Sequence, residues 1–269
     1  MIDVQNQKDT RQIKIQQTGV TGVYLPIFIF DGGEVQQVLA KIKFTVALSE
    51  NIRGTHMSRL MEILTEKISA PLKVSSLKEI LQDAIEKLNT DFSAITFAFK
   101  FFVQKSAPIS EKKSLLDIDV QICGELSAEK NLKLSLALNV PFTSLCPCSK
   151  EISDFGAHNQ RSICRVKLKF ADAEKLIDFN IKNFAELIEA QGSSKIFPLL
   201  KREDEKFVTE AAYQNAKFVE DILRDEVIAL RGVKNLSGFE VECENFESIH
   251  NHNAFASHSE NFLAGEFSN

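Results

Sequence analysis

The chain has 269 residues, 44% of them hydrophobic, which is enough to bury one large core or two smaller ones. A formal net charge of −5 excludes a surface built throughout to coat nucleic acid or an acidic membrane, so any anionic ligand must be held by a local group of cations. The five cysteines are an odd number, no segment has the roughly 18 apolar residues of a membrane helix, and residues 1–11 lack a signal-peptide layout. We therefore expect a cytoplasmic protein with no membrane or nucleic-acid partner.

The first half of the chain predicts two strands, two helices and two further strands. Strand segments carry apolar residues at every second position, and helical segments carry them at every third or fourth. In chain order these elements are strands at 24–30 and 42–48, helices at 58–68 and 76–88, and strands at 95–103 and 116–122. Ser76 and Glu79 have the spacing of a capping box, which predicts that the second helix starts there.

The second half predicts the same order of elements again. They are strands at 132–138 and 164–170, helices at 183–191 and 204–230, and strands at 239–243 and 250–258. Gly192 is expected to end the first of these helices, because glycine readily adopts the backbone conformation that follows a helix.

The repeated order predicts an α+β fold made of tandem ββααββ units, at 1–130 and 131–269, which suggests an internal duplication. The connections between strands are short enough for antiparallel sheets, and we expect the helices on one sheet face. Open sheet edges favour pairing with a neighbour, so we expect a homo-oligomer.

Residues 145–162, LCPCSKEISDFGAHNQRS, concentrate metal-binding and titratable side chains between two predicted strands. Cys146 and Cys148 flank Pro147, whose fixed φ favours a turn, so the two sulfurs are expected to serve different purposes. One would bind a metal and the other would face a substrate. With His158 in the same loop, this is where we expect the chemistry of the protein.

Two later segments add carboxylates and imidazoles. Residues 201–206, KREDEK, place acidic residues at a helix start behind two cations. His250 and His252 lie two positions apart and would share a face if they lay on a strand. Glu220 and its neighbour Asp221 lie deeper in the long predicted helix, so one of them approaches the apolar side and needs a partner. Thiolate, imidazole and carboxylate with an open coordination position suit a catalytic divalent ion.

These residues also have purely structural interpretations. Cys123, Cys164 and Cys243 lie on strand patterns and are most simply core residues, because free cysteine packs as a small hydrophobe. An alternative role for His158 is to satisfy the loop backbone, and for His56 to hydrogen-bond at a helix start. The charged run around Lys201 is equally typical of a solvated helix start.

Five motifs give the chain a family resemblance. They are GTHMSR at Gly54–Arg59, SLCPCSKEIS at Ser144–Ser153, GAHNQRS at Gly156–Ser162, DEKFVTEAAYQNAKFVED at Asp204–Asp221 and ESIHNHNA at Glu247–Ala254. In this order, and over nearly the whole chain, they resemble the type IB GTP cyclohydrolases, the prokaryotic enzymes that begin folate and deazaguanine biosynthesis. Glu203 and Ala216 depart from the family pattern, in which proline is common, but neither would carry chemistry.

The resemblance implies a tunnelling fold, in which ββααββ units assemble into barrels, with two units per chain and a homotetramer. It also implies conversion of GTP and water into 7,8-dihydroneopterin triphosphate and formate, begun by attack of metal-activated water on guanine C8. The metal would be Zn²⁺, Mn²⁺ or Fe²⁺, since the mixed donor set accommodates all three.

The resemblance further implies roles for individual residues. By position, Cys146, His158 and Glu205 match the metal ligands, and Cys148 matches a cysteine that contacts substrate and is needed for turnover. Glu220 matches the carboxylate that anchors guanine through a pair of donors that adenine lacks. The remaining catalytic candidates are the proton carriers His250 and His252, and the remaining substrate-binding candidates are His56, Arg59, Lys150, Arg161, Lys201 and Arg202, whose cations would face the triphosphate.

Two other functions are compatible with parts of the pattern. A zinc-dependent nucleobase deaminase also uses metal-bound hydroxide, but its paired signature of H-x-E and P-C-x-x-C is missing. A non-catalytic metal- or pterin-binding protein of the same fold would not require Cys146, Cys148, His158 and Glu205 all to be intact.

Overall fold

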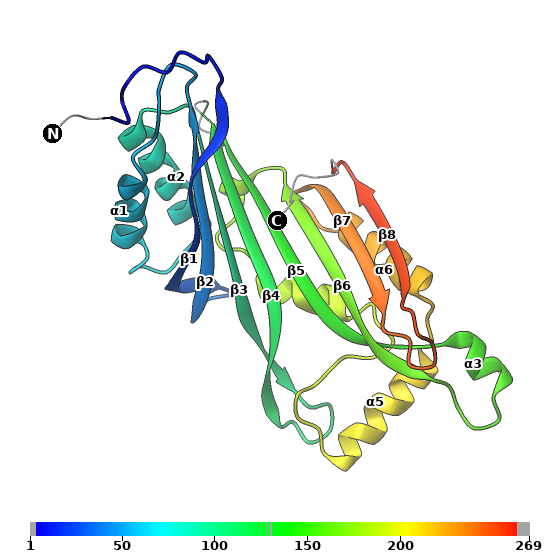
Figure 1. The fold of residues 1–269 in the computed structure, drawn as a ribbon. Helices are drawn as coiled ribbons and strands as arrows, with labels where there is room; N and C mark the ends of the chain where they lie inside the picture. Colours follow the sequence, from blue (N-terminus) through cyan, green and yellow to red (C-terminus); the bar gives the residue numbers. More distant parts are fainter. Residues whose placement is uncertain (1–3, 128, 130, 263–269) are drawn as a thin grey trace. The chain divides into compact units, whose positions relative to one another are not determined.

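The computed structural model describes residues 4–127, 129 and 131–262 (Figure 1). The strands are β1 (Ile15–Asp31), β2 (Glu34–Leu48), β3 (Phe92–Ser106), β4 (Lys113–Ser127), β5 (Leu132–Leu145), β6 (Asn159–Phe170), β7 (Leu236–Asn245) and β8 (Ala254–Glu260). The helices are α1 (Met57–Lys67), α2 (Val74–Leu88), α3 (Pro147–Ile152), the 3-10 helix η1 (Ala173–Lys175), α4 (Ile181–Glu189), α5 (Arg202–Gln214) and α6 (Val219–Arg231).

The eight strands form one sheet in which strands adjacent in sequence are adjacent in space, from β1 to β8. Pairing is antiparallel, as the sequence predicts, and the α+β class is confirmed. β1 and β2 are joined by Gly32 and Gly33, both at positive φ (57° and 82°), which is the backbone that a two-residue hairpin turn requires.

One compact unit contains the described residues up to Lys100 together with Gln121–Leu136 and Asp172–Asn180. In this unit, α1 and α2 lie side by side (Figure 1). Each helix has one buried apolar face, because its leucines and isoleucines recur at helical spacing. With the fully buried rings of Phe44 and Phe97 on the strands, they form the core of the unit.

The other compact unit contains Phe101–Val120, Ala137–Ala171 and the described residues from Ile181 onward. In this unit, α6 packs against β7 and β8. The segment after α4 lies tightly against β5, since a Cβ on Gly192 would come within 2.6 Å of the Phe142 ring. None of the helices in the described part of the chain is long and apolar enough to cross a membrane.

Several boundaries differ from the sequence prediction. The helix predicted at 204–230 is two helices, α5 and α6. The break lies at Asn215, the C-cap of α5, whose side chain donates to the carbonyls of Gly192 (3.0 Å) and Ser193 (3.3 Å). Asp221 then begins the next helix by accepting from the backbone N–H of Phe218 (3.1 Å).

The second difference is at α2, which begins at Val74 with Lys73 as its N-cap, so the capping box predicted at Ser76 is wrong. The third is at the last strand, which starts at Ala254 instead of 250. His250 and His252 therefore lie in the turn before β8, and not on one face of a strand.

Candidate active site

The loop between β5 and β6 gives its two cysteines different surroundings. Cys146 is the N-cap of α3, and its Sγ accepts from the backbone N–H of Ser149 at 3.4 Å. Pro147 occupies the first helical position, where its missing N–H costs nothing. Cys146 is half-buried, whereas Cys148 is exposed. The sequence places the sulfurs two residues apart, and the short helix separates their environments.

Hydrogen bonds tie the two ends of this loop together. The N–H of Cys146 donates to the carbonyl of His158 at 3.1 Å. In return, the N–H of His158 donates to Ser149 Oγ at 3.1 Å, and that hydroxyl donates to the carbonyl of Cys146 at 3.3 Å. Cys146 and His158, twelve positions apart in sequence, are thus held side by side.

The imidazole of His158 is surrounded by acceptors on one side. Its Nδ1 lies 2.9 Å from Gln160 Oε1 and 3.7 Å from Glu247 Oε2. Glu247 arrives from the end of β7, where the N–H of Phe246 donates to the carbonyl of Arg161 at 3.1 Å. Both oxygens therefore face the same ring nitrogen.

The two histidines after Glu247 form a pair in the turn between β7 and β8. The rings of His250 and His252 are stacked, with centroids 5.0 Å apart, and both residues are exposed. The Asn253 side chain anchors this turn by donating to Glu244 Oε1 at 2.7 Å. The Asn253 hydrogen bond, and then that of Arg165, lower the pKa of Glu244, so it stays ionised.

The start of α5 presents Glu205 to solvent and buries its neighbour Asp204. Asp204 accepts from the backbone of Lys201 (2.8 Å) and Ile109 (2.8 Å), and from both the N–H (2.9 Å) and the hydroxyl (2.5 Å) of Ser110. Burial raises the pKa of Asp204, but these hydrogen bonds outweigh it and hold the pKa well below its usual range. Lys201 and Arg202, like Glu205, are exposed.

Glu205 is not brought to Cys146 and His158 within one chain. Lys150 on α3 donates to the carbonyl of Tyr213 at 2.6 Å, so α3 contacts the last turn of α5. Glu205 lies eight positions earlier, which is about 12 Å along the helix axis. Among residues 4–127, 129 and 131–262, no group of three or more His, Cys, Asp or Glu side chains is arranged to hold a metal.

The substrate candidates are spread over several elements. Glu220 lies in the first turn of α6 and is exposed; Arg161 on β6 is also exposed. His56 and Arg59 line a cavity of about 480 Å³ in the unit that contains α1. Arg59 donates to the carbonyl of Lys87 at 2.9 Å, which holds its side chain at this cavity.

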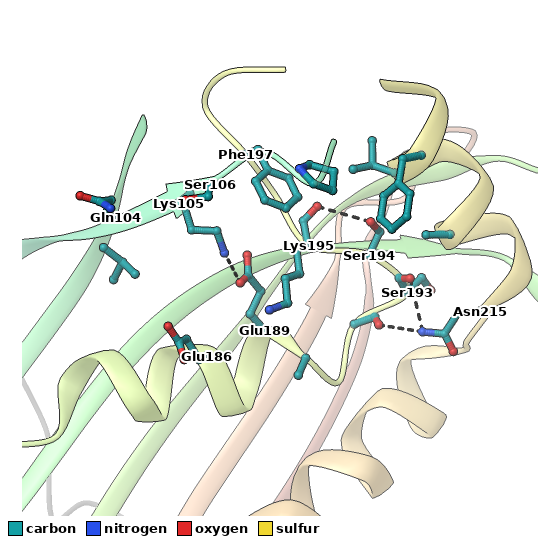
Figure 2. A pocket seen from close by; sticks show the side chains of 17 residues that line it. Gln104, Lys105, Ser106, Glu186, Glu189, Ser193, Ser194, Lys195, Phe197 and Asn215 are labelled. Atoms are coloured by element: carbon teal, nitrogen blue, oxygen red, sulfur yellow. Dashed lines mark hydrogen bonds and ion pairs between the residues drawn. The ribbon is translucent and has the colours of Figure 1, made fainter. Parts of the chain in front are cut away.

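A larger cavity, of about 550 Å³, is lined in part by the segment that follows α4 (Figure 2). Figure 2 shows Lys105 and Glu189 pointing at one another, and both are buried. Glu189 also accepts from the backbone N–H of Ile196 at 3.2 Å. Ser193 Oγ in turn accepts from the N–H of Leu145 at 3.2 Å, so this segment supports the strand end that leads into Cys146.

Several of these residues are not predicted as site residues from the sequence. Lys105 occupies an inward position of an alternating strand, and Gln160 and Ser162 occupy inward positions of β6. Polar residues at positions where the alternation calls for apolar ones were the available signal. The resemblance implies a role for Glu205 by position, and only the fold reveals that its neighbour Asp204 is buried.

Comparison with solved structures defines the fold class. Uricase from Arthrobacter globiformis aligns with a TM-score of 0.54 and 8% identity, covering 94% of this chain and 96% of that one. Urate oxidase from Bacillus sp. TB-90 aligns with a TM-score of 0.52 and 7% identity, covering 91% and 99%. At such identities the likeness shows the fold alone, and it is the tunnelling fold that the motifs imply.

Comparison with known sequences defines the family. The family model described as type I GTP cyclohydrolase folE2 matches residues 1–256. GTP cyclohydrolase FolE2 from Geotalea uraniireducens is 44% identical over 95% of this chain and 92% of its own length. The protein of the same name from Dictyoglomus thermophilum is 44% identical over 95% and 96%. The chain belongs to the type I GTP cyclohydrolase FolE2 family, and neither alternative function is supported.

Proposed function

We propose that this chain converts GTP and water into 7,8-dihydroneopterin triphosphate and formate, in the cytoplasm, as the first step of a folate-forming route. The observation that carries the proposal is the family match over residues 1–256, which includes every motif that bears a site residue. The joining of Cys146 and His158 at the two ends of one loop supports it.

We assign Cys146, His158 and Glu205 as ligands of a divalent metal, Zn²⁺, Mn²⁺ or Fe²⁺. The donor set fits such an ion: Nδ1 of His158 is engaged by Gln160, which leaves Nε2 as the donor, and Cys146 Sγ accepts only the long hydrogen bond from Ser149. When bound, the ion supplies hydroxide at neutral pH by lowering the pKa of the water that it coordinates.

The protein residues position GTP and move protons. Glu220 accepts from N1–H and the exocyclic amine of guanine, which selects guanine over adenine. The five-membered ring opens at C8, a second hydrolysis releases C8 as formate, and rearrangement of the ribose followed by ring closure returns one water. His250 and His252, exposed and stacked, carry the protons of these steps, while Cys148 contacts the substrate.

We assign the triphosphate to basic side chains, some of which a neighbouring copy of the chain would supply. Arg59, with His56 beside it, lines the smaller cavity. The other cations are Lys150, Arg161, Lys201 and Arg202. A multiply charged anion favours several such donors, because each charge-assisted hydrogen bond adds to the binding of the phosphate oxygens.

The proposed active form is a homotetramer whose copies complete one another's sites. Phe155 is 100% exposed and Ile152 is 84% exposed in the loop that follows Cys146, and such apolar side chains favour burial against a partner. The separation of about 12 Å along α5 leaves Glu205 remote from its own Cys146 and His158. We therefore propose that Glu205 of one copy joins the thiol and imidazole of a neighbouring copy.

The deciding experiment is turnover of GTP by purified, metal-loaded protein. We expect formate and a fluorescent pterin; release of ammonia would indicate a deaminase, and neither product would indicate a binding protein. Cys148→Ala should retain metal and lose turnover, whereas Cys146→Ala should lose metal. Metal content measured by elemental analysis tests this division, and equal metal loss in both variants would refute it.

A further inference from the structure

A chain of buried polar side chains runs behind the imidazole of His158. Ser144, Gln160 and Ser162 are 0%, 8% and 1% exposed. The hydroxyl of Ser162 donates to Ser144 Oγ at 2.8 Å, and Nε2 of Gln160 donates to the same oxygen at 2.8 Å. The other end of the Gln160 amide, Oε1, lies 2.9 Å from His158 Nδ1. The network therefore ends on one specified nitrogen of the ring.

Packing does not account for these residues. Gln160 and Ser162 occupy the inward-facing positions of β6 that Cys164 and Val166 continue, where an aliphatic side chain would fill the space. A buried amide or hydroxyl is costly unless it is hydrogen-bonded, and a partly satisfied network is worse than an apolar one. Here each member bonds to the next, which is the arrangement expected of side chains that orient a functional group.

Glu247 favours one orientation of the Gln160 amide over the other. Its Oε2 is 3.7 Å from Nδ1, and a carboxylate oxygen is a hydrogen-bond acceptor. A proton on Nδ1 is attracted by both Gln160 Oε1 and Glu247. In the reverse amide orientation, the NH₂ group of Gln160 would donate to an unprotonated Nδ1. The lone pair of Nδ1 would then lie near the Glu247 carboxylate, and the two would repel one another. The surroundings thus favour the tautomer with Nδ1 protonated and the Nε2 lone pair free.

We propose that Gln160 is a positioning residue: its amide, held by Ser144 and Ser162, fixes His158 as the Nδ1–H tautomer and presents Nε2 to the divalent cation. The inference rests on the proposed function in that it takes His158 as a metal ligand. It concerns the hydrogen bonding of the ring, however, and applies to any of the candidate metals.

Three variants separate this role from general stability. Gln160→Met is nearly isosteric but has no acceptor for Nδ1–H. Gln160→Glu keeps an acceptor in the same place and should preserve both the Nδ1–H tautomer and the Zn²⁺ affinity. Gln191→Met makes the same chemical change at a half-buried glutamine of the same unit that donates to the carbonyl of Leu187 (2.8 Å) and lies outside the network.

The first measurement is the ¹⁵N spectrum of the imidazoles in metal-free protein at about pH 9, well above the ordinary imidazole pKa. The ring of His158 is assigned by comparison with His158→Gln. We expect protonated Nδ1 in the native protein, in Gln160→Glu and in Gln191→Met, and a shift toward protonated Nε2 in Gln160→Met. An Nε2–H ring in the native protein would overturn the proposal whatever the activity.

The second measurement is Zn²⁺ affinity, determined by competition with a chromophoric chelator. We expect Gln160→Met to bind Zn²⁺ about 10- to 100-fold more weakly, the usual effect of losing such a partner, and Gln160→Glu to restore affinity to within about threefold. Unchanged affinity in Gln160→Met, or an equal loss in Gln191→Met, contradicts the proposal. Should Gln160→Met fold poorly, Ser162→Ala provides a milder lesion with the same expected direction.

Failure of this inference is distinguishable from failure of the proposed function. Protein that binds Zn²⁺ through an Nδ1–H imidazole but releases no formate from GTP would leave the positioning role intact and overturn the function. Protein that releases formate while its His158 carries the proton on Nε2 would do the reverse.

Discussion

Glu226 on α6 shows what burial does to a single carboxyl group. It is 0% exposed, and within the described part of the chain neither of its oxygens has a hydrogen-bond partner. Burial, and then the neighbouring Cys243, raise its pKa well above the ordinary value, so the group is held protonated. Cys243 Sγ lies 3.5 Å from Cys164 Sγ, and both cysteines are fully buried, which confirms the prediction that they are core residues.

The protonated Glu226 makes stability depend on pH. The unfolded chain releases this proton near its ordinary pKa of 4.5, whereas the folded chain keeps it to higher pH. Between these values the free energy of unfolding falls as pH rises, by up to about 1.4 kcal/mol per pH unit. Glu226→Gln removes this dependence and should be more stable than the native protein at about pH 8, with little difference below about pH 4.5.

Urea unfolding at several pH values measures the effect of Glu226→Gln. Glu186→Gln, at an exposed glutamate of α4, is the matched control and should follow the native curve. Parallel pH dependence in Glu226→Gln and the native protein would show that the buried carboxyl does not titrate as described.

At the scale of elements, the strands were the most predictable feature. The alternating segments 42–48 and 95–103 lie within β2 and β3, because a half-buried strand shows its two faces in sequence. β1 is longer than predicted: it begins at Ile15, where its side chains are exposed but its backbone still pairs with β2. Backbone pairing leaves no apolar pattern, so that extension was not readable.

The start of α5 is an element whose position depends on one side chain. Asp204 accepts hydrogen bonds from the backbone N–H groups of Ile109 and Ser110. It also accepts from the N–H of Lys201, the N-cap residue of α5. Asp204→Ala should therefore increase amide hydrogen exchange across the first turn of α5 and at Ile109 and Ser110, and it should reduce GTP turnover, because the adjacent Glu205 loses its fixed place.

Hydrogen exchange read by mass spectrometry checks the Asp204→Ala prediction. The control is Glu203→Ala, at an exposed acidic residue of the same turn. If the two variants exchange alike, the buried carboxylate does not hold the helix start.

At the scale of the whole molecule, the proposed site residues lie on several separate elements. Cys146, Cys148 and His158 share one loop, and Glu205 lies in the first turn of α5. Arg59 lines a cavity in the other compact unit. We also propose that 1–130 and 131–269 descend from one duplicated ββααββ unit. The order of the elements supports this, with α3, η1 and one further helix inserted in the second half.

Complementation between inactive variants tests whether copies complete one another's sites. Cys146→Ala and Glu205→Gln should each lack turnover when assembled alone. Mixed tetramers, formed by co-expression with two different tags and purified through both, should regain activity, since a site can then combine an intact Cys146 from one copy with an intact Glu205 from another. Light scattering on the same samples checks the assembly.

Mixed tetramers that stay inactive would place all three ligands in one chain and require α5 to move. A mixture of Cys146→Ala with His158→Ala is the matched control. Its two lesions fall in the same loop, so a mixed site still lacks one member of the pair, and no activity should return.

The sequence alone determined the family, the antiparallel α+β architecture and the loop that carries Cys146 and His158. Motif letters and alternation are local properties, which can be read along the chain without the fold. Only the tertiary structure decided that Gln160 and Glu247 both face Nδ1 of His158, that Asp204 rather than Glu205 is buried, and where the long predicted helix breaks. These outcomes depend on contacts between segments far apart in the chain, which packing and burial select and local pattern does not record.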